Sequence, residues 1–298
     1  MKITNENNIP LPIYRAICQN WYGGKNYKHF CSITSLLKGT KQFVLESRHS
    51  DEIETEASEQ VWQLLGSAMH AVLEKAVAEN TLVEERLATE IDGKIVSGGI
   101  DHYENGVITD FKFTSVYTWI FGSRIKEWTK QLNAYAYLYK KAGFPVDKLQ
   151  IICIFRDWSK SKYRNKRWDE KYPKQIEIIN LELWEDQITE DFIREKLAEF
   201  EAGLDLPDDM VEPCSYEERW EEEPQYALCK NGAIRATKLY PTPEDAENAL
   251  QALTNKDQYH IEPRLKEPKK CNEYCAVNKF CSYYKARLLE GTPMGDAA

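Results

Sequence analysis

The stretch of sequence from residue 96 to residue 113, VSGGIDHYENGVITDFKF, holds Asn105-Gly106 between two short runs of strand-forming residues. Asn-Gly in that setting favours a two-residue type I′ turn, because both central residues need a positive φ. Such a turn fixes the register of the two strands, and counting outward from it places Asp101 opposite Asp110. The sequence therefore predicts a β-hairpin that carries two carboxylates face to face.

These two carboxylates indicate a cation site. Like charges directly opposite one another destabilise a sheet unless something offsets them, and Mg²⁺ or Mn²⁺ prefers carboxylate oxygens as ligands. Lys112 follows Asp110 by two residues, so both side chains lie on the same face of the strand. An ammonium group there can orient a water molecule or stabilise charge that develops on a phosphate. The alternative is a solvated hairpin with an incidental Asp-x-Lys, and a three-residue turn would shift the register.

The residues around the hairpin alternate between helical and strand patterns. Helical spacing is found over 34–49, with Thr34 as the candidate cap, over 58–77 and over 123–141. Strand patterns are found over 85–91, 94–103, 106–113, 149–155 and 175–183. The first three strands are joined by two-residue turns and are expected to form an antiparallel meander. The order αβββαβ predicts an α/β fold whose core is a mixed sheet flanked by helices.

Three regions are expected along the chain. Residues 1–30 are polar and weakly periodic and are expected to form an irregular arm, whereas residues 31–205 form the core. Residues 206–298 form a C-terminal lobe with an acidic linker, a small β-β-α-β pattern and a group of cysteines. The start of the chain lacks the apolar stretch of a secretory signal, and no apolar run reaches the length of a membrane span. A cytoplasmic protein with reduced cysteines and no membrane partner is therefore expected.

The hairpin and its neighbours resemble a known nuclease family. The stretch GGIDHYENGVITDFK is similar to the central motif of the PD-(D/E)xK nuclease superfamily, which has a restriction-endonuclease-like core. Gln131 and Tyr135 match the QxxxY helix of the RecB-like exonuclease branch, and His70 matches the helix histidine that precedes the hairpin there. The resemblance implies a DNA exonuclease that uses Mg²⁺ or Mn²⁺. It also implies a set of site residues: His70, Asp101, Asp110 and the Phe111 carbonyl as metal ligands, with Lys112, Gln131 and Tyr135 assisting catalysis.

Each flanking residue also has a simpler interpretation. A single histidine on a helix is more often a core or surface residue than a ligand, although Gly66 one turn before His70 would leave a ligand room. Gln131 and Tyr135 lie one turn apart and could contact phosphate or support the catalytic strand, but Tyr135 could equally be core packing.

The C-terminal cysteines Cys271, Cys275 and Cys281 have the spacing C-x3-C-x5-C, which can wrap a metal or a cluster. Cys214 is the preferred fourth ligand, because the β-β-α-β unit could return the chain to it. The arrangement resembles the iron-sulfur clamp of AddB-type and CRISPR-associated nucleases, which implies a [4Fe-4S] cluster, with Zn²⁺ as the alternative. It departs from that pattern in its first gap and in the position of the distant cysteine, so Cys18 and Cys31 stay open as the fourth ligand.

The net charge of −9 conceals a segregated distribution. Residues 111–174 carry fifteen Lys or Arg against five Asp or Glu, whereas residues 182–223 carry three against seventeen. The basic segment includes the loop 160–174 and aromatic side chains interleaved with cations over 115–130, a pattern that suits stacking of bases and binding of phosphates. DNA with a free or single-stranded end is therefore the expected partner.

No G-x-x-x-x-G-K-[ST] motif occurs, so a helicase or recombination protein would have to be a separate chain. DNA recombination, repair and phage-type DNA processing are the processes that this combination suggests. Two alternatives stay open: a non-catalytic nucleic-acid-binding or recombination accessory protein, and a site-specific endonuclease.

Overall fold

The computed structural model describes residues 2–20, 29–76, 82, 86–165, 171–233 and 235–289. The chain divides into two compact units. The first comprises Met1–Lys38 and Asp51–Ala202, and the second comprises Gly39–Ser50 and Gly203–Ala298. A short segment from the N-terminal part of the chain thus belongs to the same unit as the C-terminal cysteines, which the sequence pattern did not indicate.

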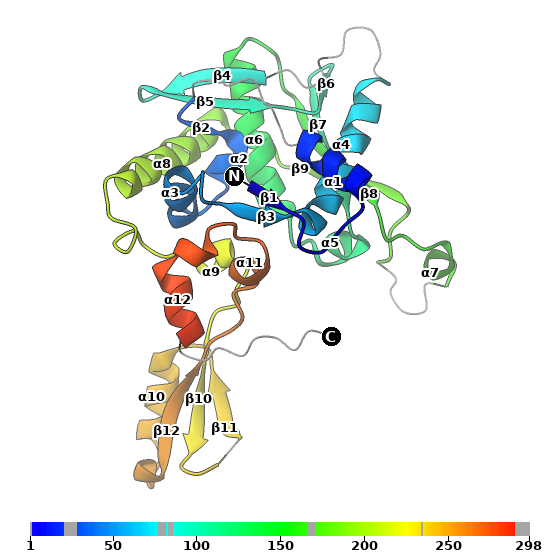
Figure 1. Ribbon diagram of the computed structural model, residues 1–298. Helices are drawn as coiled ribbons and strands as arrows, with labels where there is room; N and C mark the ends of the chain where they lie inside the picture. The colour runs from blue at the N-terminus through cyan, green and yellow to red at the C-terminus, as the bar shows by residue number, and fades with distance from the viewer. Residues whose placement is uncertain are drawn as a thin grey trace. The chain divides into compact units, whose positions relative to one another are not determined.

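The first unit is a mixed α/β structure in which helices flank several sheets (Figure 1). One sheet has the order β2-β5-β4, from the strands β2 (Cys31–Ser32), β5 (Lys94–Gly99) and β4 (Arg86–Ile91). The other has the order β6-β7-β8-β9, from β6 (His102–Glu104), β7 (Val107–Thr114), β8 (Lys148–Phe155) and β9 (Ile176–Leu181). Strand β7 pairs antiparallel with β6 and parallel with β8, so the sheet is mixed as expected.

Both predicted two-residue turns are confirmed. Asn105 and Gly106 have φ angles of 48° and 80°, and Asp92 and Gly93 have φ angles of 50° and 74°. These positive values are what a type I′ turn requires of both central residues. The register also matches the prediction, since β6 pairs with β7 from His102 opposite Thr109 to Glu104 opposite Val107.

The predicted three-stranded meander is wrong in its middle strand. Residues 94–103 form two strands, β5 and β6, which belong to different sheets. The chain leaves the first sheet after Gly98-Gly99, where the absence of side chains weakens a strand. Asp101 therefore lies at the junction of the two sheets, immediately before β6.

A buried helix supports both sheets. Helix α6 (Ile125–Lys141) contacts β4 and β5 of one sheet and β7, β8 and β9 of the other. Its residues Gln131 to Tyr139 are buried without interruption, as is typical of a helix covered on all sides. The other helices of this unit, apart from those named below, are α4 (Val61–Glu74), α5 (Val116–Phe121), α7 (Lys160–Arg164) and α8 (Asp186–Leu204).

Two predictions near the N-terminus are wrong. The expected irregular arm contains β1 (Lys2–Thr4) and α1 (Leu11–Asn20), and β1 pairs in parallel with β3 (Glu54–Glu56). That partner lies some fifty residues away, so no local pattern marks the strand. The expected helix over 34–49 is split into α2 (Ile33–Leu36) and α3 (Thr40–Arg48), with Gly39 as the N-cap of α3. The cap of α2 is Ser32 instead of Thr34, because the Ser32 side chain accepts from the Ser35 N–H.

The second unit contains the expected β-β-α-β pattern. Its sheet has the antiparallel order β11-β10-β12, from β11 (Ala236–Tyr240), β10 (Gln225–Lys230) and β12 (Tyr259–Arg264). Helix α10 (Pro243–Gln251) contacts all three strands and begins at the side-chain cap of Thr242. Its remaining α-helices, apart from α3, are α9 (Tyr216–Arg219), α11 (Lys269–Glu273) and α12 (Ser282–Leu289). None of the helices in the described part of the chain is both long and apolar enough to cross a bilayer.

Candidate active site and cysteine centre

Asp101 is held by the opposing strand and by helix α4. Its Oδ2 atom accepts a hydrogen bond of 2.8 Å from the backbone N–H of Phe111, the residue after Asp110. Its Oδ1 atom lies 3.4 Å from Nδ1 of His70. The structure therefore brings the predicted helix histidine and the first hairpin carboxylate together. Phe111 contributes its N–H to this arrangement, while the predicted role of its carbonyl stays a prediction.

Asp110 is a buried carboxylate in the centre of β7, with 6% of its surface exposed. Burial raises the pKa of this carboxyl to about 6, and the nearby charge of Asp101 adds to the rise, whereas Lys112 and His70 oppose it. Lys112 Nζ forms an ion pair with Asp110 Oδ2 at 2.7 Å. The geometry of this contact is not that of a hydrogen bond, so the buried oxygen has no hydrogen-bond donor among the described residues. The site thus holds two neighbouring carboxylates with incomplete compensation of charge.

Lys112, Gln131 and Tyr135 form a polar row behind Asp110. Lys112 Nζ lies 3.5 Å from Oε1 of Gln131, and Tyr135 follows Gln131 by one turn of the buried helix α6. Burial raises the pKa of Tyr135, and the charge of Asp110 raises it further. Gln131, one of the two helix residues that the sequence singled out, therefore lies beside Lys112 of strand β7.

Gly98 makes room for Tyr135. A Cβ atom at this position would lie 2.5 Å from Cε1 of Tyr135 and 2.8 Å from Cγ1 of Ile33, closer than atoms in contact can approach. The tyrosine ring thus occupies the space that any other residue at position 98 would fill. Sequence reasoning did not single out Gly98, although a glycine inside a strand often marks such a close approach.

We expect Gly98→Ala to lower the stability of the first unit by about 1–3 kcal/mol, because overpacking forces the Tyr135 ring to move. The displacement should also disturb the neighbouring Gln131 and Lys112. Thermal unfolding measures the loss of stability. Gly66→Ala on α4 is the matched control, since a Cβ there would meet nothing within 4 Å. That change should be neutral or stabilising, because alanine is the better helix former.

A second polar row, which sequence reasoning missed, flanks the site. Arg86 Nη1 donates to the Oγ of buried Ser97 at 3.1 Å, and that oxygen lies 3.2 Å from Nδ1 of His29. The charge of Arg86 also lowers the pKa of Tyr135, against the larger effects of burial and Asp110. The sequence could have predicted this contact, because the Asp92-Gly93 turn places Arg86 and Ser97 diagonally across β4 and β5.

The donor set of this site fits a hard divalent cation. Two carboxylates, one of them with an incompletely satisfied buried oxygen, and one histidine face the same region. Oxygen ligands with one nitrogen suit Mg²⁺ or Mn²⁺ better than a soft metal. The ligand atoms of His70, Asp101 and Asp110 do not all lie within 4.8 Å of one another in the described structure. Binding would therefore require them to draw together.

The structure groups Cys214 with Cys271, Cys275 and Cys281 in the second unit. Burial raises the pKa of the Cys271 thiol to about 12, and the other three cysteines add to the rise. Burial likewise raises the pKa of Cys275 to about 11, again with contributions from Cys214 and Cys281. No three of these sulfur atoms lie within 4.8 Å of one another in the described residues.

Cys214 is positioned by the start of α3. A Cβ on Gly39 would lie 2.6 Å from its Sγ, and the backbone of Gln42 hydrogen-bonds to its thiol. The N-terminal segment of the second unit therefore lies against the candidate fourth ligand. The other candidates belong to the first unit: Cys31 is buried in β2, and the pKa of its thiol is raised to about 12 by burial alone, while Cys18 is exposed on α1.

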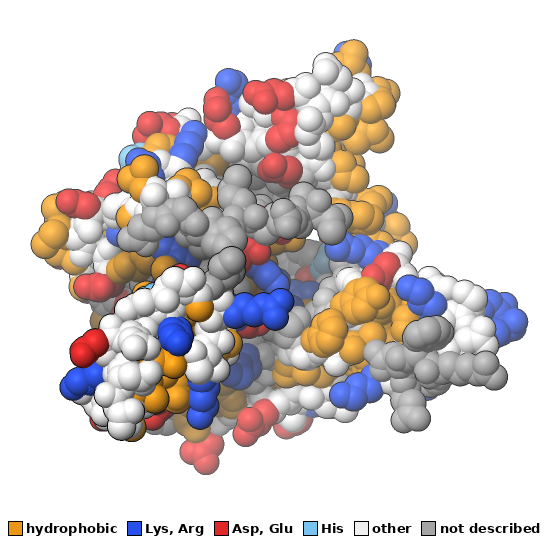
Figure 2. All heavy atoms as spheres, turned by 90° about the horizontal axis from the view of Figure 1, so that it is seen from below, with side chains coloured by type: hydrophobic (Ala, Val, Ile, Leu, Met, Phe, Trp, Pro, Cys, Tyr) orange, Lys and Arg blue, Asp and Glu red, His pale blue; other side chains and the backbone are white. Residues whose placement is uncertain are grey.

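The aromatic residues before α6 divide into buried and exposed ones. Trp128 is buried in the core, whereas 53% of Tyr117 and 75% of Phe121 are exposed on α5. The two exposed rings stack, with centroids 6.0 Å apart and planes 15° apart. Figure 2 shows hydrophobic side chains gathered beside basic ones on the α5 and α7 side of the first unit. Residues 166–170 of the basic loop lie outside the described residues.

No protein-family model matches the chain, and no curated protein matches it either. Among solved structures, seven chains match. One is the crystal structure of SSO0001, which is 17% identical, with the match covering 62% of this chain and 83% of that chain at a TM-score of 0.43. So distant a likeness assigns no function to the residues described above.

Proposed function

We propose that this chain is a metal-dependent deoxyribonuclease of the PD-(D/E)xK type, with a restriction-endonuclease-like core, and that it acts as an exonuclease. The observation that carries the proposal is the buried Asp110 beside Asp101, with Lys112 Nζ 2.7 Å from the Asp110 carboxylate. Burying the Asp110 carboxylate beside a second carboxylate is costly even with Lys112 close by, so the arrangement is not explained by stability. Such an arrangement is typical of a functional site.

In the proposed hydrolysis of phosphodiester bonds, the site residues have different roles. Asp101, Asp110 and His70 would hold Mg²⁺ or Mn²⁺, which supplies Lewis-acid chemistry and an acidified water when it is bound. The Lys112 ammonium can orient the attacking water and stabilise the negative charge that develops on the phosphate oxygens. Gln131 lies 3.5 Å from Lys112 Nζ and would help to position it, and Tyr135, one turn further along α6, would support the same strand.

The second centre is proposed as a [4Fe-4S] cluster held by Cys214, Cys271, Cys275 and Cys281, with Zn²⁺ as the alternative. Burial and the neighbouring thiols raise the pKa of Cys271 and Cys275, so these thiols are costly to ionise unless a metal shares their charge, and both groups accept four thiolates. The proposed role is structural. The test is metal analysis of anaerobically purified protein. A protein that contains neither iron nor zinc would contradict the assignment.

The exposed rings of α5 support DNA with a single-stranded end as the substrate. We expect the double variant Tyr117→Ala with Phe121→Ala to weaken binding of single-stranded DNA by about 10- to 100-fold, because stacking contributes about 1–3 kcal/mol per base. Fluorescence anisotropy at constant salt measures this. Ile178→Ala is the matched control, since Ile178 is a comparably exposed hydrophobic side chain on β9 of the same unit. Equal affinities of the two variants would show that α5 does not contribute to DNA binding.

The test of the nuclease itself is degradation of end-labelled linear and circular DNA with Mn²⁺, Mg²⁺ or EDTA. Loss of linear DNA with sparing of circles would make the enzyme an exonuclease. Cleavage of both at fixed positions would make it a site-specific endonuclease. Binding without cleavage by the metal-supplied protein would favour a recombination accessory protein.

A further inference from the structure

A third group of metal-ligating side chains lies on the small sheet of the second unit. Cys229 on β10 is directly opposite His260 on β12, and Glu262 lies two residues further along β12, so both β12 side chains share a face. Their ligand atoms all lie within 4.8 Å of one another. No other three His, Cys, Asp or Glu residues meet this condition in the part of the chain that the structure describes.

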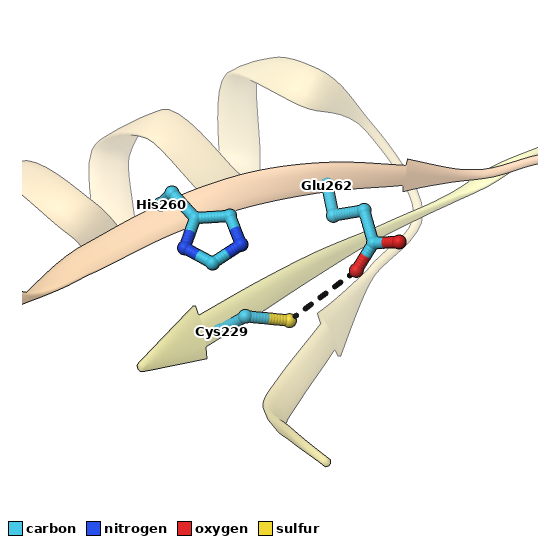
Figure 3. Close-up of side chains that lie close together, drawn as sticks. All are labelled: Cys229, His260 and Glu262. Carbon is cyan, nitrogen blue, oxygen red and sulfur yellow. Dashed lines mark hydrogen bonds between the residues drawn. The ribbon is translucent and has the colours of Figure 1, made fainter. Parts of the chain in front are cut away.

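The side chains are turned toward a common point. The Cys229 Sγ lies 3.8 Å from Oε2 of Glu262, and Figure 3 shows one ring nitrogen of His260 on the side of these two residues. Two ligands of one tetrahedral zinc ion, at ordinary Zn–S and Zn–O bond lengths, are about 3.5 Å apart. The observed separation therefore needs only a small adjustment to accept an ion.

The orientation of the imidazole is set by Asn231. The Asn231 amide nitrogen donates to the backbone oxygen of Asp257 at 3.0 Å, which leaves its Oδ1 atom to accept from Nδ1 of His260 at 2.9 Å. With the proton on Nδ1, the lone pair of the neutral ring is on Nε2. Metal-binding histidines are held in this way by a hydrogen bond to their other nitrogen. Asn231 is thus a positioning residue for the ligand.

Burial distinguishes Cys229 from an incidental surface thiol. Only 2% of Cys229 is exposed, whereas His260 and Glu262 are exposed, so the sulfur approaches from the protein side and the other ligands from the solvent side. Cys229 and Cys153 both lie on β-strands, where a buried cysteine usually acts as a small packing residue. Cys153 matches that description, since it is buried in β8 and no ligand group of this kind includes it among the described residues.

From these contacts we infer that Cys229, His260 and Glu262 bind one Zn²⁺ ion, separately from the nuclease site and from the four-cysteine centre. A thiolate, an imidazole and a carboxylate together suit zinc and disfavour Mg²⁺, which takes oxygen ligands. Binding removes the thiol proton of Cys229 to solvent and joins its sulfur to the ion. The fourth position of the ion faces solvent. The ion links β10 to β12 across the segment that contains β11 and α10, and so stabilises the sheet.

The experiment uses the full chain, purified and reconstituted with Zn²⁺ after removal of loosely bound metal. Elemental analysis should find one zinc equivalent less in His260→Asn and in Glu262→Gln than in the wild type. Cys153→Ser is the matched control for a buried strand cysteine and should retain the zinc content of the wild type. Asn231→Ala should weaken zinc affinity by about 10- to 100-fold, because it removes only the support of the histidine.

A second readout identifies the ligands. Co²⁺ bound in place of zinc should give a thiolate charge-transfer absorption whose Cys229-dependent part is absent from Cys229→Ser and present in Cys153→Ser. His260→Asn and Glu262→Gln change exposed side chains, so they keep the test valid if Cys229→Ser does not fold. Zinc content and cobalt spectra that are the same in the wild type and in these folded variants would overturn the assignment. An unchanged spectrum in Cys229→Ser alone would exclude the sulfur as a ligand.

Discussion

If the chain is the proposed nuclease, Asp110→Asn should abolish DNA hydrolysis, with an expected loss on the order of a thousandfold or more in the rate at saturating metal. The substitution keeps the shape of the side chain and removes the charge that would hold the cation beside Asp101. It also removes a buried carboxylate whose pKa is raised to about 6 by burial, so the folded protein loses no favourable charge by it. The lost activity should therefore appear in a protein whose unfolding temperature is unchanged or higher in the absence of metal.

The matched control for this variant is Glu104→Gln. Glu104 lies on the same hairpin, at the turn end of β6, and its carboxylate is 3.5 Å from Nε2 of His102 on its own strand. Its loss should leave hydrolysis within about twofold, because exposed ion pairs contribute little. Lys112→Ala should lose activity while retaining metal binding. Wild-type rates in Asp110→Asn would refute the assignment of the site, whatever the behaviour of the control.

If Cys214, Cys271, Cys275 and Cys281 hold the proposed metal centre, Cys271→Ser should release that metal and destabilise the second unit. The helices around that centre are short, since α9 spans four residues and α11 spans five. Helices of that length are not stable by themselves and depend on tertiary contacts. Binding of a structural metal by four thiolates supplies on the order of 10 kcal/mol of apparent free energy, so its loss should exceed what the remaining contacts can offset.

Visible absorption and metal content of anaerobically purified protein measure the first effect, and limited proteolysis followed by fragment mapping measures the second. Cleavage should begin within the second unit, at residues 203–289 of the described chain. Cys18→Ser is the matched control, because Cys18 is exposed on α1 of the first unit. It should keep both the metal and the proteolytic pattern of the wild type. Full metal occupancy in Cys271→Ser would show that the centre has other ligands.

A buried ion-pair group determines how far this destabilisation spreads. Glu221 is fully buried and pairs with Arg219 at 2.6 Å and with Arg287 on α12 at 3.1 Å. The guanidinium of Arg219 also lies over the rings of Tyr216 and Tyr283. Leaving any of these charges buried without its partner is costly, so α9 and α12 should separate together when the cysteine centre is lost.

The turns and the register of the β6–β7 hairpin were determined by the sequence alone. Asn105-Gly106 and Asp92-Gly93 prescribe positive φ at both central residues, and that local chemistry sets which residues face one another for several positions on either side. Helix α6 was equally marked by its own residues, whose helical spacing covers nearly the same range as the observed helix. The pattern of residues was therefore sufficient to propose the hairpin carboxylates and Lys112 as a site, whereas Gln131 and Tyr135 were proposed from the resemblance to the nuclease family.

Only the tertiary structure decided which distant segments meet. The division of residues 94–103 between two sheets, the pairing of β1 with β3 and the inclusion of Gly39–Ser50 in the second unit all depend on partners far away in the chain. The placement of Cys214 in the same unit as Cys271, and the pairing of Cys229 with His260, have the same origin. Local preferences act over a few residues, whereas these contacts are selected by the burial of surface in the complete fold. The raised pKa of Asp110 also depends on the complete fold. The sequence identifies this carboxylate, but only the folded protein removes it from water.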